Sequence, residues 1–157
     1  MQIIDNKALL LRLRDPDKVT NAIPKSKAVG DNQVVVNWGL EEARSLNQLG
    51  IKSPSPIEVK YTWTGRYKPF DHQVSTASFL TLHQKGFCFN EQGTGKTASA
   101  IWASDFLMKQ GVINRVLVVC PLSIMDSAWR DDLFTFATHR TVSVAHGSAE
   151  KRSKVIQ

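Results

Sequence analysis

Glycine, lysine and threonine recur near the middle of the chain with the spacing of a phosphate-binding loop. An apolar run at 87–89 is followed by Asn90-Glu91-Gln92-Gly93-Thr94-Gly95-Lys96-Thr97 and then by small residues. Glycines let a main chain turn tightly. The consecutive N–H groups of such a turn surround an anion at a helix N-terminus. The pattern therefore predicts a site for the phosphates of a nucleoside triphosphate.

Each side chain of this loop has an expected task. Lys96 is expected to contact the β- and γ-phosphates and Thr97 to ligate Mg²⁺, which makes these two the expected catalytic residues. The expected ATP contacts of the loop are Gln92, Gly93, Thr94, Gly95, Lys96, Thr97 and Ala98. The alternative is an ordinary glycine-containing loop with a solvated lysine. Asn90 stands where the pattern usually has Gly or Ala, and Asn tolerates unusual φ values.

An aromatic and an amide side chain precede the loop in the chain. Phe70 and Gln73 lie at the head of an expected helix. A glutamine amide has the donors and the acceptor that match adenine, and an aromatic ring offers a face for stacking. We expect Phe70 and Gln73 to bind the adenine ring. The alternative for Gln73 is a surface position on the helix.

A Pro-Leu-Ser segment follows the next apolar run. Pro121, Leu122 and Ser123 come directly after an expected strand at 115–120. Ligands bind at the carboxyl ends of strands in open α/β sheets, and a serine hydroxyl with helix amides suits a phosphodiester oxygen. We expect this segment to contact nucleic acid. Ser123 as a simple helix cap explains the local sequence equally well.

Alternating elements are expected to position these residues. Apolar runs predict strands at 87–89, 115–120 and 141–146, and helical periodicity predicts helices at 71–83, 96–111 and 124–136. Nearly continuous apolar strands are typical of parallel sheets covered on both faces. Strands that alternate with helices predict right-handed crossovers. The second half of the chain is therefore expected to be an α/β domain with a parallel sheet.

The first half predicts a smaller module. Strands are expected at 8–13 and 33–38, with a helix at 39–50 whose apolar residues recur at helical spacing. A proline-rich connector follows, in which aromatics alternate with cations. That connector is either a nucleic-acid surface or a packing segment, with packing favoured. The expected domains are an accessory α+β module and connector at 1–68 and the nucleotide-binding domain at 69–157.

The composition limits the class of protein and the compartment in which it is expected. The chain has 157 residues, of which 42% are hydrophobic and 22% charged, and a net charge of +6. These values exclude a disordered chain, and the positive charge suits an anionic partner. No apolar stretch reaches the length of a membrane span. The two cysteines are expected to be buried, reduced thiols, which points to the cytoplasm.

In order and spacing, four segments resemble the first motor lobe of superfamily 2 helicases, particularly the SWI/SNF-type branch of double-stranded DNA translocases. They are Gln73, Gly93 to Thr97, Pro121-Leu122-Ser123 with Trp129, and His146-Gly147-Ser148. The resemblance covers about 69–154. It implies a RecA-like P-loop NTPase fold, ATP hydrolysis with Mg²⁺ and movement on DNA. By analogy with phage and repair members that carry small N-terminal modules, residues 1–68 are expected to assist DNA engagement. The expected setting is the cytoplasm of a bacterial or phage-infected cell.

The expected machinery is incomplete. No acidic cluster follows a strand to orient the attacking water, since Asp105, Asp131 and Asp132 lie within expected helices. We therefore expect an N-terminal fragment of a longer ATP hydrolase, with little activity by itself. Two alternatives stay open. One is a P-loop kinase or another NTPase that does not act on nucleic acid, and the other is a non-enzymatic nucleic-acid-binding module.

Overall fold

The computed structural model describes residues 1–156, which form two compact units. Unit 1 comprises Met1–Thr62 and Ser75–Phe87, and unit 2 comprises Trp63–Val74 and the chain from Cys88 onward. Helix α4 (Asp71–Leu82) begins in unit 2 and continues in unit 1. The units are described separately below.

Unit 1 contains a four-stranded antiparallel sheet. Its strands are β1 (Gln2–Ile4), β2 (Ala8–Arg12), β3 (Lys27–Ala28) and β4 (Gln33–Asn37), in the order β1-β2-β4-β3. In the central pair, Leu9 lies opposite Val36 and Leu11 opposite Val34. The strands expected at 8–13 and 33–38 are thereby confirmed. The short edge strands β1 and β3 were not expected.

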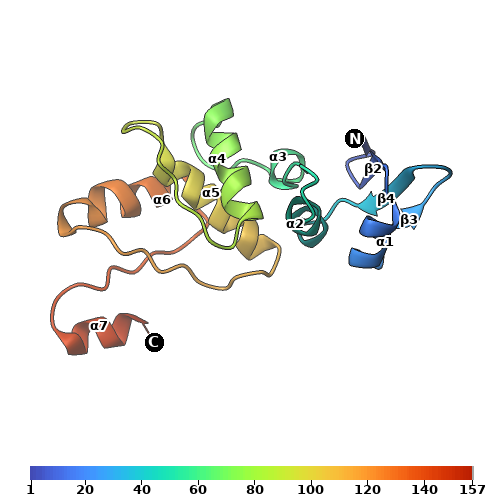
Figure 1. The fold of residues 1–157 in the computed structure, drawn as a ribbon. Coiled ribbons are helices and arrows are strands. Elements are labelled where there is room, and N and C mark those ends of the chain that lie inside the picture. Colours follow the sequence, from blue (N-terminus) through green and yellow to red (C-terminus); the bar gives the residue numbers. More distant parts are fainter. Residues whose placement is uncertain (157) are drawn as a thin grey trace. The chain divides into compact units, whose positions relative to one another are not determined.

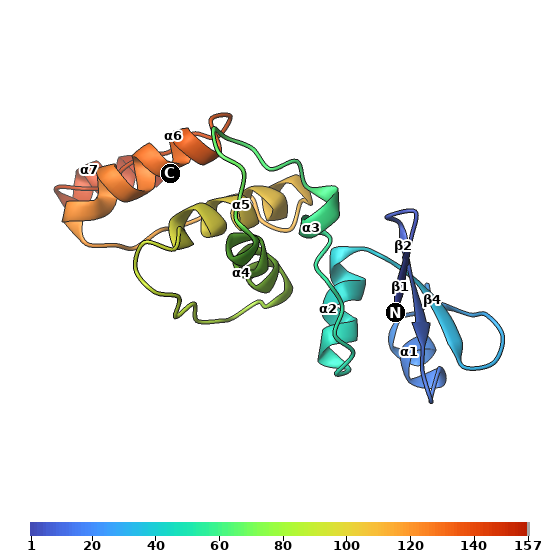
Figure 2. The same ribbon diagram turned by 90° about the horizontal axis from the view of Figure 1, so that it is seen from above.

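The core of unit 1 lies on one face of this sheet. Alternate residues of β2 and β4 are buried, as period-2 patterning requires. Figures 1 and 2 show α1 (Asp17–Ala22) beside the sheet, and its Val19 is fully buried in the same cluster. Helix α2 (Leu40–Gln48), which confirms the helix expected at 39–50, contributes Leu46. The apolar faces of two helices and the sheet thus form one core.

Polar contacts join the rest of unit 1. Helix α3 (Ile57–Lys60) follows the proline-rich segment. The buried hydroxyls of Ser55 and Thr81 are 2.7 Å apart, and the Arg44 guanidinium donates to the Thr81 carbonyl oxygen at 3.0 and 2.8 Å. These bonds satisfy polar groups that burial would otherwise leave unpaired.

The described part of unit 2 is helical and irregular. After α4 come α5 (Lys96–Lys109), a 3₁₀ turn η1 (Leu122–Ile124), a π-helical segment η2 (Met125–Arg130), α6 (Asp131–Phe136) and α7 (Ala149–Ile156). The helices expected at 71–83 and 96–111 are confirmed, and the one expected at 124–136 is divided between η2 and α6. The Trp102 ring of α5 packs edge-on against Trp63 and Phe136, with centroids 5.5 and 5.1 Å away.

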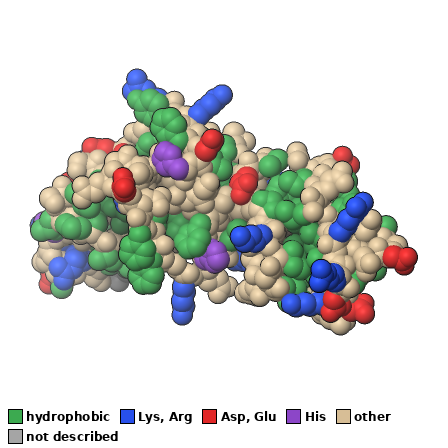
Figure 3. All heavy atoms as spheres, turned by 45° about the horizontal axis from the view of Figure 1, so that its top comes forward, with side chains coloured by type: hydrophobic (Ala, Val, Ile, Leu, Met, Phe, Trp, Pro, Cys, Tyr) green, Lys and Arg blue, Asp and Glu red, His purple; other side chains and the backbone are tan. Residues whose placement is uncertain are grey.

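The expected α/β fold with a RecA-like parallel sheet is wrong. The structure is α+β, and its one described sheet is the antiparallel sheet of unit 1. Segments 87–89, 115–120 and 141–146 form no strands. Hydrophobic side chains reach the surface on the face drawn in Figure 3; the most exposed in these runs are Phe87, Phe89, Leu117 and Val119, at 81, 89, 80 and 89%. An apolar run favours extended backbone, but a strand also needs a hydrogen-bonded neighbour.

Two smaller expectations concern burial. No helix within 1–156 is both long enough and apolar enough to cross a membrane. Cys88 and Cys120 are free, but both are half-buried, so the expectation of buried thiols is only partly met.

Candidate nucleotide-binding loop

The glycine-rich segment turns directly into a long helix. Gly93 and Gly95 have φ values of 77° and 74°, a region that disfavours residues with a Cβ atom. Asn90 has no positive φ, so its tolerance of unusual φ is not needed. Gly95 is the N-cap of α5, and no side chain caps this end. The amides of the first turn lack intrahelical acceptors, so they can bind an anion.

The Lys96 side chain folds back onto the loop. Its ammonium donates to the carbonyl oxygens of Asn90 at 2.8 Å and Glu91 at 2.7 Å. The Thr94 hydroxyl donates to the same Glu91 oxygen at 2.8 Å, so the turn is closed by its own polar groups. A cation is thereby held at the loop, and phosphate oxygens would compete with two neutral carbonyls for it. Charged acceptors form the stronger hydrogen bond.

The residues around Lys96 differ in burial. Gln92 and Gly93 are exposed, whereas Ala98 is buried beneath the turn. Thr97 is half-buried in the first turn of α5, and within 1–156 its hydroxyl makes no hydrogen bond. A Mg²⁺ ion prefers one or two protein oxygens together with phosphate oxygens. The Thr97 hydroxyl fits that requirement, whereas no group of three or more His, Cys, Asp or Glu side chains in the described chain could hold a metal alone.

Two side chains from the start of α4 contact this loop at one atom. The Thr94 carbonyl oxygen is 3.3 Å from Gln73 Nε2, which donates to it, and 3.0 Å from His72 Nε2. Gln73 Oε1 accepts the Phe70 N–H at 3.0 Å. The NH2 of the Gln73 amide keeps one further donor and its Oε1 one further acceptor position, which is what adenine needs. The sequence interpretation missed His72, although a histidine beside Gln73 at a helix start was a signal.

Phe70 lies next to these contacts. Its side chain is 69% exposed, and its ring stacks on the His72 ring with centroids 5.7 Å apart and planes at 10°. The opposite face of an exposed ring in this position suits a purine. The structure therefore brings Phe70, Gln73 and the loop 92–98 together in unit 2.

The Pro-Leu-Ser segment has another local structure than expected. Pro121, Leu122 and Ser123 are exposed at the start of η1, but no strand precedes them. Ser123 does not cap the helix; its carbonyl accepts the Ser127 hydroxyl at 3.4 Å. In the described chain, no hydrogen bond joins this segment to the loop at 92–98. The segment therefore offers an exposed hydroxyl without the expected sheet edge.

Comparison of the chain with protein-family models, with curated proteins and with solved structures gives no match.

Proposed function

We propose that the loop at 92–98 binds ATP together with Mg²⁺, and that the protein is an ATP-dependent DNA helicase or translocase. One observation supports the ATP site. Helix α5 begins without a side-chain cap, directly after two glycines with left-handed backbone conformation, and the Lys96 ammonium is held at the same turn. Main-chain amides, a helix terminus and a cation then act on one polyphosphate.

Each side chain has a task in this proposal. The Lys96 ammonium leaves the two carbonyls and pairs with the β- and γ-phosphates, where it stabilises the negative charge that develops during phosphoryl transfer. The Thr97 hydroxyl holds the Mg²⁺, which neutralises phosphate charge when it is bound. Gln73 and Phe70 bind adenine through the remaining amide positions and the exposed ring.

The nucleic-acid part rests on charge and on the resemblance of the motifs. A net charge of +6 favours a polyanion, and the exposed Ser123 hydroxyl can donate to a phosphodiester oxygen. We propose double-stranded DNA as the partner, with the Pro121-Leu122-Ser123 segment on one strand's backbone. Ser123→Ala should weaken DNA binding and leave ATP binding unchanged, as measured with a labelled duplex. Ser153→Ala removes an exposed hydroxyl from α7 and is the control.

Titration of the chain with Mg·ATP in a calorimeter tests the ATP site. Lys96→Ala should weaken ATP binding at least tenfold because the charged partner of the phosphates is lost. Lys85→Ala removes an exposed lysine with no described ion pair and should leave the affinity unchanged. Equal ATP affinity in the wild type and in Lys96→Ala would contradict the proposal.

Base preference separates this proposal from an NTPase of another class. The donor and acceptor of Gln73 match N6–H and N7 of adenine, whereas the same edge of guanine carries two acceptors, O6 and N7. Gln73→Ala should therefore lower the affinity for ATP and leave that for GTP nearly unchanged. Equal affinities of the wild type for GTP and ATP would favour an NTPase of another class.

A further inference from the structure

A pocket in unit 2 has no role in the proposed nucleotide site. It has a volume of about 540 Å³, within the range of small-ligand pockets. Its lining residues are Gly65, Arg66, Tyr67, Phe134, Thr135 and Thr138. We call it the Arg66–Tyr67 pocket. None of its residues belongs to the loop at 92–98 or to the start of α4.

Main-chain contacts hold the two walls of the pocket together. The Arg66 N–H donates to the Thr135 carbonyl oxygen at 3.0 Å, and the Thr64 hydroxyl donates to the Phe136 carbonyl oxygen at 2.7 Å. Gly65 has φ 101°, and a Cβ there would lie 2.5 Å from the Thr135 carbonyl oxygen and 2.6 Å from Phe136 Cα. Only glycine permits this close approach. These two hydrogen bonds and Gly65 therefore hold the two walls of the pocket against each other.

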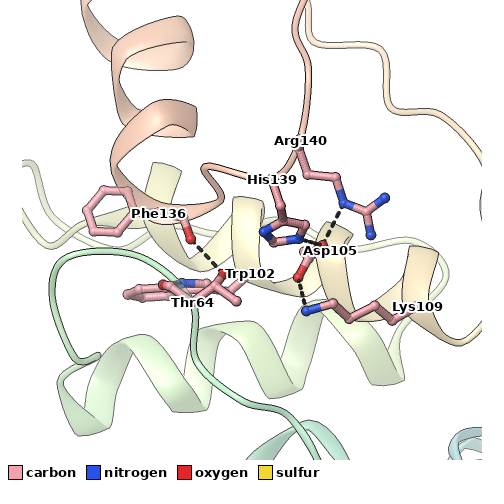
Figure 4. A network of polar contacts seen from close by, with 7 residues as sticks. All are labelled: Thr64, Trp102, Asp105, Lys109, Phe136, His139 and Arg140. Atoms are coloured by element: carbon pink, nitrogen blue, oxygen red, sulfur yellow. Dashed lines mark hydrogen bonds and ion pairs between the residues drawn. The ribbon is translucent and has the colours of Figure 1, made fainter.

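A buried carboxylate anchors the chain just beyond α6, as Figure 4 shows. The Asp105 side chain is only 1% exposed. Its Oδ1 accepts from His139 Nε2 at 2.8 Å and Arg140 Nε at 2.7 Å, and its Oδ2 pairs with Lys109 Nζ at 2.9 Å. These bonds tie the residues after Thr138 to α5. The pocket wall from α6 is consequently fixed at its C-terminal end.

The side chains that face the pocket combine aromatic surface with a cation. Tyr67 and Phe134 are 55 and 52% exposed, so part of each ring is open to a ligand. The Arg66 guanidinium lies over one face of the Tyr67 ring, with Cζ 5.5 Å from its centroid. The Thr138 hydroxyl has no hydrogen-bond partner within 1–156. Aromatic faces, a guanidinium and a hydroxyl are the groups that bind a base and its phosphate.

We propose that the Arg66–Tyr67 pocket binds a base of a single-stranded nucleic acid. The base stacks on the exposed aromatic surface of Tyr67 and Phe134, and the Arg66 guanidinium pairs with an adjoining phosphate. A single strand is favoured over a duplex because a paired base keeps both faces stacked inside the helix. The net charge of +6 complements such a strand. Trp63 of the same connector packs on Trp102 instead, so the aromatics of the connector divide between packing and binding.

Fluorescence anisotropy of a labelled twelve-residue deoxythymidine strand tests this proposal on the whole chain. Tyr67→Ala should weaken binding about tenfold because one stacked base is lost, and Tyr67→Phe should retain it. Arg66→Ala should also weaken binding, and more than Arg12→Ala, which removes the same charge from an exposed position in unit 1. Phe134→Ala tests the opposite wall, so a failure of one variant to fold leaves the other to decide.

Changes to the ligand provide the remaining tests. An abasic strand of equal length should bind at least tenfold more weakly, and thymidine monophosphate should compete poorly with the strand. Lys96→Ala should bind the strand like the wild type, which separates this pocket from the proposed ATP site. The proposal is overturned if the abasic strand binds as tightly as the single strand. It is also overturned if the free mononucleotide binds as tightly, or if Tyr67→Ala and Phe134→Ala have no effect.

Discussion

The Gln73 side chain occupies the space that a Cβ atom on Gly95 would need. Its Nε2 is the nearest atom to that position, and the same nitrogen donates to the Thr94 carbonyl oxygen. Gly95 also has φ 74°. A glycine is therefore required at this place for two separate reasons, one of backbone conformation and one of contact with the helix that carries Gln73.

Replacement of Gly95 should disrupt the loop more than replacement of Gly93. Both residues have positive φ, but a Cβ at Gly93 would meet no atom within 4 Å. Gly93→Ala should lower the free energy of unfolding by about 1–2 kcal/mol, the cost of left-handed backbone for alanine. Gly95→Ala adds the displacement of Gln73 and should lose ATP affinity as well. Urea denaturation and ATP titration of both variants measure the difference.

A double variant isolates the contact with Gln73. If displacement of the amide causes the extra loss, Gly95→Ala introduced into the Gln73→Ala variant should cost no more stability than Gly93→Ala costs in the wild type. A loss from Gly95→Ala that is equally large with and without the Gln73 side chain would show that the contact with Gln73 is irrelevant.

Local patterns predicted the helices and the central strands of unit 1. Leu40, Ala43 and Leu46 recur at helical spacing and are buried on one face of α2. In β2, alternation places Leu9 and Leu11 on the core side. In these segments, one buried face sets both the conformation and the contacts, so the sequence pattern was sufficient.

The parallel sheet failed because its prediction rested on apolar composition alone. Val116 and Val118 are 46 and 38% exposed, and Leu117 and Val119 are 80 and 89% exposed. The segment is thus covered more on one side than on the other, but it pairs with no described strand. Pairing depends on a partner distant in sequence, which a local apolar run does not encode.

The site shows a similar division. Local spacing predicted the turn at Gly93–Thr97 and the helix that it opens, whereas the contact of His72 with Thr94 depends on tertiary structure. The environment of Asp105 was also missed, although a carboxylate within an apolar helix was a signal for buried partners.

The Thr97 hydroxyl should affect ATP binding only when Mg²⁺ is present. Because this hydroxyl has no described protein partner, Thr97→Ala should leave the free energy of unfolding nearly unchanged. It should lower the affinity for Mg·ATP severalfold, and Thr97→Ser should retain it since the ligand oxygen is kept. Titration in excess EDTA should make all three proteins equal. An equal loss of ATP affinity with and without Mg²⁺ would assign Thr97 to packing instead.

Deprotonation of the Asp132 carboxyl should lower the free energy of unfolding as the pH rises. Burial, and then repulsion by Asp131, raise the pKa of Asp132 above its ordinary value of 3.8. The native state therefore binds the proton more tightly than the unfolded state, and stability falls as the pH rises through the native pKa. Asp132→Asn should raise the free energy of unfolding at pH 7 by a few tenths of a kcal/mol, because solvent screens this partly exposed group.

Urea denaturation at several pH values checks the sign. The gain from Asp132→Asn should be present above the native pKa and disappear as the pH falls below the ordinary value. Asp131→Asn removes only the second cause and also loses a contact of 3.7 Å with Arg130, so its gain should be smaller. A gain from Asp132→Asn that does not change with pH would refute this explanation.

Asp105 should contribute more to the stability of unit 2 than an exposed carboxylate with an equally short ion pair. Asp105→Asn keeps the shape of the side chain but removes the buried negative charge that Lys109 and Arg140 share. We expect the free energy of unfolding to fall by about 2–4 kcal/mol. Asp126→Asn removes an exposed pair with Arg130 of 2.8 Å and should cost less than about 1 kcal/mol.

Tryptophan fluorescence in urea, which does not screen charges as guanidinium does, compares the two variants. Equal losses would mean that burial gives Asp105 no special part in holding the wall of the Arg66–Tyr67 pocket.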